Sequence, residues 1–191
     1  MNLYTVDTGQ NTGFDYYVST DNAYEFVTLE DIKDRMDLPS VDDEDVMYNQ
    51  IKGVRIYLES VLNMCLTPAK TITAYWQTFS DRINLPFAPV SSVTSVTRVA
   101  HSDGTETALA ASEYWVEGVN KKAVRLQTVY RGYGMKIVYI VALTDVGMIS
   151  LVKDAILSEV VEWFHQRTNP DETQYVLGKI AMSKLNTFRP L

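Results

Sequence analysis

The strongest constraint on the fold of this chain is a change in the spacing of its apolar residues near residue 70. Before that point apolar residues recur at steps of three and four, which is typical of one face of a helix. From Lys70 to Leu143 they recur about every second residue, which is typical of strands. The strands expected there follow one another too closely for helices between them, so the sheet is predicted to be mainly antiparallel.

The best marked of these strands is expected over 90–100. Pro86 and Pro89 hold the chain before it in an extended conformation. Asp103-Gly104 comes after it and predicts a tight reversal. The other expected strands are 71–79, 82–85, 105–109, 114–117, 123–126 and 136–143.

Helices are expected on both sides of this β region, over 28–38, 42–66 and 150–168. Thr28 is the predicted N-cap of the first, with Asp31 in the position of a capping box. The second has an apolar face made of Met47, Ile51, Val54, Leu58, Val61, Leu62 and Cys65. The third has an apolar face made of Val152, Ala155, Ile156, Val160, Trp163 and Phe164. Its polar face is expected to carry Lys153, Asp154, Glu159 and Glu162.

The acidic run Asp42-Asp43-Glu44-Asp45 is interpreted as a helix cap. Negative charge at a helix N-terminus complements the helix dipole, by about 0.3 to 1 kcal/mol for each group. A divalent-metal site is the alternative for the same residues. No zinc pattern, glycine-rich phosphate loop or nucleophile elbow occurs, and neither His101 nor His165 has a partner at ligand spacing. We therefore expect no catalytic, cofactor-binding or metal-binding residues, no cofactor and no enzyme activity.

Composition narrows the class of protein further. A hydrophobic fraction of 46% with 21% charged residues is that of a globular chain. The formal net charge of −7 argues against gripping nucleic acid, which needs a basic face. The single cysteine, Cys65, excludes an internal disulfide and is interpreted as a small buried hydrophobe. With no run of roughly 18 apolar residues and no secretory signal at the start, a cytosolic protein without a membrane partner is expected.

The two ends of the chain are expected to lie outside the main domain, which is predicted over 27–169. Residues 1–26 form a predicted arm, too polar for a core of its own but rich in aromatic side chains that would lie against this domain or a neighbouring chain. Residues 170–191 form a predicted tail. Its last apolar residues either dock into a partner or belong to a frayed end.

The order of these elements and several local strings resemble the head–tail connector proteins of tailed bacteriophages, also called adaptor or head-completion proteins. The resemblance covers about residues 27 to 169. The strings that carry it are Val27 to Lys33, Asp42 to Asp45, Leu85 to Val96, Val138-Tyr139 and Lys153 to Arg167, with a fainter match at Lys184 to Arg189.

This resemblance implies an α+β fold: a mainly helical core of a helix pair plus a long C-terminal helix, a small antiparallel β insertion, and extended N- and C-terminal arms. It implies a structural ring, typically of twelve copies, under the portal protein of the virion. Such a ring joins capsid to tail and lines a channel through which double-stranded DNA passes without sequence-specific binding. The implied partners are further copies, the portal protein, and the tail or next connector protein, with synthesis in the bacterial host cytoplasm.

Two sets of residues gain an expected role from the resemblance. The portal-docking set is Leu185, Phe188, Arg189 and Leu191. The set expected to contact a neighbouring copy is Tyr4, Phe14, Tyr16 and Tyr17. An acidic channel wall would repel phosphates and let the duplex slide. Two alternatives stay open: a tail-completion or terminator protein that binds the tail tube, and a small-molecule-binding enzyme domain whose site is built from dispersed residues.

Overall fold

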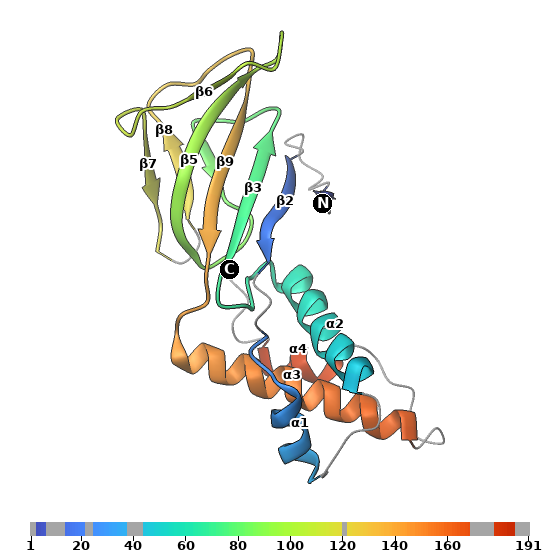
Figure 1. Ribbon diagram of the computed structural model, residues 1–191. Coiled ribbons are helices and arrows are strands. Elements are labelled where there is room, and N and C mark those ends of the chain that lie inside the picture. Colours follow the sequence, from blue (N-terminus) through green and yellow to red (C-terminus); the bar gives the residue numbers. More distant parts are fainter. Residues whose placement is uncertain are drawn as a thin grey trace. The chain divides into compact units, whose positions relative to one another are not determined.

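The computed structural model describes residues 3–6, 14–21, 25–37, 44–119, 122–168 and 178–185. The chain divides into two compact units. The β unit comprises Met1–Asn22 and Ala69–Ala142, and the helical unit comprises Ala23–Pro68 and Leu143–Leu191. Each unit is therefore built from two separate stretches of the chain (Figure 1).

The described part of the β unit contains two sheets. Strands of the larger sheet are, in spatial order, β1 (Leu3–Val6), β2 (Phe14–Asp21), β3 (Lys70–Trp76), β9 (Tyr133–Val141), β5 (Val90–Ala100) and β6 (Glu106–Ala108). Strands of the smaller sheet are β4 (Arg82–Asn84), β8 (Ala123–Leu126) and β7 (Tyr114–Glu117). Every pairing between neighbouring strands is antiparallel, which confirms the prediction from strand spacing.

Strand β5 shows how the sequence builds the buried face of the larger sheet. Val90, Val93 and Val96 are three residues apart, whereas side chains of a regular strand alternate with a period of two. The register against β9 shifts twice, once after Val90 and once after Val93, and each shift adds one residue to β5. These shifts let the three valines pair with buried residues of β9, namely Val141, Tyr139 and Ile137.

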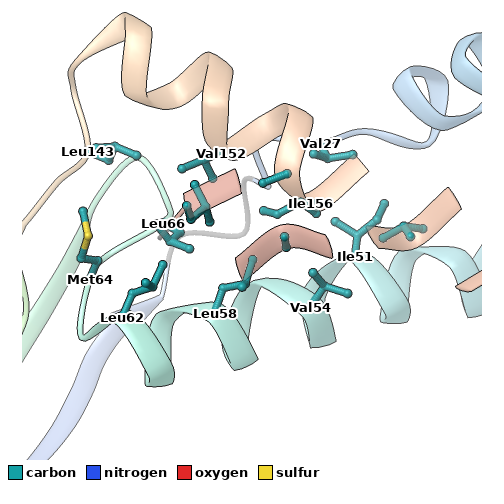
Figure 2. Packing of buried hydrophobic residues seen from close by; sticks show 14 of the residues in the cluster. Val27, Ile51, Val54, Leu58, Leu62, Met64, Leu66, Leu143, Val152 and Ile156 are labelled. Atoms are coloured by element: carbon teal, nitrogen blue, oxygen red, sulfur yellow. The ribbon is translucent and has the colours of Figure 1, made fainter. Parts of the chain in front are cut away.

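The described helices are α1 (Leu29–Met36), α2 (Glu44–Leu62), α3 (Val146–Thr168) and α4 (Lys179–Leu185). Helix α3 contacts each of the other three. Figure 2 shows part of the core of this unit, to which α2 contributes Leu58 and Leu62 and α3 contributes Val152 and Ile156. Burial of these side chains confirms the apolar faces predicted for both helices.

Two local predictions in the helical unit are also confirmed. The Thr28 hydroxyl accepts a hydrogen bond from the Asp31 backbone N–H at 3.1 Å, and the Thr28 N–H donates to the Asp31 carboxylate at 2.8 Å. This reciprocal pair is the expected capping box. Cys65 is buried, as predicted, but it lies beyond the end of α2 at Leu62.

The predicted fold class, a mainly helical core with a small β insertion, is wrong. The strands form a compact unit of their own with two sheets, not a small insertion in a helical core. Regular elements also occur where only extended arms were expected, with β1 and β2 at the start and α4 near the end. Residues 15–18 of β2 are all partly exposed, so this strand tolerates polar side chains, and its backbone is satisfied by pairing with β3.

Candidate interaction site at the C-terminal helix

Helix α4 holds the first of the four residues predicted to dock into a portal. Leu185 is its last residue, and its side chain is buried in the core of the helical unit together with Ala181. Phe188, Arg189 and Leu191 lie outside the described residues. Leu185, the one described member of this predicted set, is therefore fixed by packing.

The N-terminal end of α4 is held by a carboxylate from α3. Glu159 is fully buried and accepts hydrogen bonds from three backbone N–H groups, those of Gly178 at 2.6 Å, Ile180 at 3.0 Å and Ala181 at 2.9 Å. The first N–H groups of a helix have no partner within the helix, and a negative charge there also complements the dipole. The sequence-based placement of Glu159 on a polar outer face is wrong, because this side of α3 meets α4.

A glycine lets the chain enter α4 at this point. Gly178 has a φ of +82°, a left-handed conformation that side-chain-bearing residues rarely adopt. A Cβ atom there would also lie 2.1 Å from Cε1 of Tyr57 on α2. Both observations indicate that the docked position of α4 requires glycine at this residue.

The other end of α4 is held by an ion pair. Lys184 Nζ donates to Asp154 Oδ2 at 2.5 Å and to Ser158 Oγ at 2.8 Å, both on α3. Helix α4 is thus bound to α3 by charged groups near both of its ends and by apolar side chains between them.

The four aromatic residues expected to contact a neighbouring copy lie in two paired strands, β1 and β2. Tyr4 of β1 pairs with Tyr16 of β2, and β1 forms one edge of the larger sheet. The Tyr16 ring packs edge-on against Phe87 at 5.1 Å between centroids, whereas Tyr17, the next residue, points to the opposite face of the sheet. Only the backbones of Tyr4 and Phe14 are described, so the contacts of their side chains are outside the description.

Sequence reasoning missed the apolar side chains that the described residues leave exposed. Trp115 on β7 is 47% exposed and Val119, just after it, is 85% exposed. Ile56, on the outer side of α2, is 44% exposed. A Cβ atom added to Gly53, one helical turn before Ile56, would meet no atom within 4 Å, so nothing in its surroundings requires glycine. The sequence signal that could have pointed to this exposed face of α2 is Gly53, because glycine is unfavourable inside a helix.

No metal-binding arrangement occurs among the described residues: none of their histidine, cysteine and acidic side chains gather in threes. Within the acidic run, the Glu44 carboxylate accepts a hydrogen bond from Lys33 at 2.6 Å, which raises the pKa of Lys33. Asp42 and Asp43 fall outside the description. None of the described helices has the length and apolar character to cross a membrane.

In the β unit, a cluster around Arg98 combines charge and aromatic rings. The guanidinium lies 5.3 Å from the ring centroid of Tyr130 and 5.4 Å from that of Tyr133. Glu113 accepts hydrogen bonds from the Ala110 backbone N–H at 2.7 Å and from the Tyr130 hydroxyl at 2.8 Å. These bonds lower the pKa of Glu113, and the bond to Glu113 raises the pKa of Tyr130. The cluster ties the turn before β7 to the start of β9.

Comparison with known proteins gives matches only at the level of structure. No protein-family model matches the sequence, and no curated protein is significantly similar to it. A chain from the neck of the empty gene transfer agent (GTA) particle, computed with C6 symmetry, aligns with a TM-score of 0.70 at 14% identity. That alignment covers 92% of this chain and 95% of the other.

Two further GTA structures contain similar chains. One, from the virion of the native GTA particle, has the same TM-score, identity and coverage. The other, from the neck of the native particle computed with C12 symmetry, has a TM-score of 0.64 at 14% identity, with 92% of this chain and 96% of that chain covered. At this identity the comparisons establish a shared fold that includes both units.

Proposed function

We propose that this protein is a structural component of the neck of a tailed phage or phage-like particle, acting as a head–tail connector without catalytic activity. The observation that carries the proposal is the fold shared with GTA neck and virion chains over nearly the whole of both chains. The order of sequence elements that resembles phage connectors points to the same role independently.

The proposed assembly is a closed ring, with twelve copies as the expected number. The similar chains come from particle necks computed with C6 or C12 symmetry, which supports a cyclic arrangement. Cyclic rings use two different surfaces of each copy. The aromatic hairpin of Tyr4, Phe14, Tyr16 and Tyr17 is proposed as one of them, because β1 is an edge strand and edge strands can pair with another chain.

The proposed site of portal binding is the segment that follows α4. Leu185 anchors this segment in the core of the helical unit, while Phe188, Arg189 and Leu191 are proposed to enter the portal. Double-stranded DNA is proposed to pass through the ring without sequence-specific contacts. The net charge of −7 supports this, because an acidic wall repels phosphates.

The test is reconstitution with the portal protein and the tail-tube protein of the same genome, each in a separate mixture. Co-sedimentation with the portal, and a ring of this chain stacked on it in electron micrographs, is the expected result. Binding to the tail tube alone would replace the connector assignment with a tail-terminator role. Failure to form an oligomer in either mixture would refute a neck function.

A truncation locates the portal contact. Removing residues 186–191 leaves α4 complete, so the isolated chain should keep its fold, while portal binding should be lost. The control is Ser183→Ala, on the exposed side of α4, which should bind like the wild type. Unchanged portal binding by the truncated chain would show that the segment is not the docking site.

A further inference from the structure

We propose that Glu159 is a positioning residue for partner binding: by docking α4 on α3, it fixes the point from which residues 186–191 reach the portal. This inference rests on the function proposed above. Glu159 itself is fully buried and is not proposed to touch the partner.

Helix α4 depends on this docking for its existence. It spans only Lys179–Leu185, and isolated helices of that length do not persist in water. Its fold must therefore come from contacts with the rest of the helical unit. Those contacts are the three hydrogen bonds to Glu159, the Lys184 ion pair and the burial of Ala181 and Leu185.

Among these contacts, those of the Glu159 carboxylate cannot be reproduced by a neutral side chain of the same shape. Both of its oxygens accept hydrogen bonds, Oε1 from Gly178 and Oε2 from Ile180 and Ala181. A glutamine of the same shape offers one acceptor oxygen and turns an NH2 donor toward N–H donors. Because the site excludes water, the N–H groups left without an acceptor cannot be compensated by solvent.

Docking of α4 fixes the position of Leu185, the first residue of the proposed portal-binding set. With α4 docked, Leu185 is buried in the core of the helical unit. With α4 released, packing no longer holds Leu185 in place. Portal binding is then weaker, because the cost of ordering α4 is added to the cost of association.

The experiment compares Glu159→Gln with Glu162→Gln in the full-length chain. Glu162 lies on the same helix, is partly exposed and accepts a hydrogen bond from Gln166 at 2.8 Å, so it controls for loss of a charge on α3. Two quantities are measured: hydrogen exchange of residues 178–185 in the free protein, and the dissociation constant for the portal protein.

The expected result for Glu159→Gln is faster exchange confined to residues 178–185 and portal binding weaker by about tenfold or more. Glu162→Gln should change neither. Exchange in α2 and α3 should stay unchanged in Glu159→Gln, whereas a general loss of structure would accelerate exchange in those helices as well.

If Glu159→Gln unfolds the helical unit, Gly178→Ala serves instead. It disturbs the entry to α4 through its φ and its approach to Tyr57 but leaves the core of α3 unchanged. Unchanged exchange in both variants, or faster exchange with unchanged portal affinity, would overturn the inference. Absence of portal binding by the wild type would instead refute the proposed function and with it the role in binding, while the exchange data would still decide whether Glu159 docks α4.

Discussion

Helices α2 and α4 belong to the same unit but are held in different ways. Helix α2 buries a continuous apolar stripe of Met47, Ile51, Val54, Leu58 and Leu62. Helix α4 buries only Ala181 and Leu185 and is bound by charged groups of α3. Hydrophobic burial sums over many residues, whereas a few polar contacts fix position with little total stabilisation. We infer that α2 unfolds with the whole unit and that α4 can detach alone.

The contrast is sharpened by two charged side chains that α2 buries, Arg55 and Glu59. Arg55 Nε donates to Glu25 at 2.7 Å and its Nη1 donates to Glu59 at 2.7 Å, and all three side chains are nearly inaccessible. Arg55→Met leaves two buried carboxylates without this partner, so we expect a loss of about 3 to 5 kcal/mol in the free energy of unfolding. Chemical denaturation measures it. A loss below about 1 kcal/mol would show that the ion pairs do not matter.

Shortening one side chain in α4 should have a smaller and more local effect. Leu185→Ala removes most of a buried side chain, which should cost about 2 to 3 kcal/mol of stability. This cost should appear as detachment of α4, not as unfolding of α2. Hydrogen exchange of residues 178–185 and 47–62 is the measurement. Equal acceleration in both segments would contradict the distinction between the two helices.

The outer face of α2 allows a stabilising change. Gly53 is exposed and a methyl group there meets no atom within 4 Å, so Gly53→Ala should raise the free energy of unfolding by about 0.5 to 1 kcal/mol. The midpoint of denaturant unfolding reports it. Lys52→Ala, next to it on the helix, controls for the helix propensity of alanine itself.

The smallest expected effect concerns pH and the cap of α1. Burial acts to raise the pKa of Asp31, but hydrogen bonds from Thr28 and Lys153 outweigh it, and the net shift is downward. Because the folded pKa is below the ordinary value of 3.8, the stabilisation is present above that value and is lost as pH falls through the folded pKa. Asp31→Asn should therefore reduce stability at pH 7 and flatten its decline in acid. Identical slopes in the two proteins would contradict this.

Much of the fold follows from local patterns. The stripe on α2 specifies its buried face, the Thr28–Asp31 pair specifies the start of α1, and the bounds of β5, β7 and β8 match those predicted. In each case the information lies within a few residues of the element itself. The antiparallel order followed because short connections leave no other choice.

The rest depends on partners distant in sequence. Strand β2 is stable because β3 pairs with it, although its own residues are largely polar. Glu159 was placed on a polar face because nothing near it in sequence indicates that α4 returns to cover it. The docking role of Leu185 and the residues after it stays a prediction, and the sequence did not indicate how Leu185 is anchored.

The division of each unit into two stretches of chain has a consequence for biosynthesis. The chain passes between the units three times, at residues 22–23, 68–69 and 142–143. On the ribosome, helices α1 and α2 emerge before α3, and the second stretch of the β unit, Ala69–Ala142, is synthesised before α3 arrives to cover their apolar faces. The helical unit thus acquires its core last, and a nascent chain arrested before residue 143 displays an unpaired amphipathic helix to chaperones.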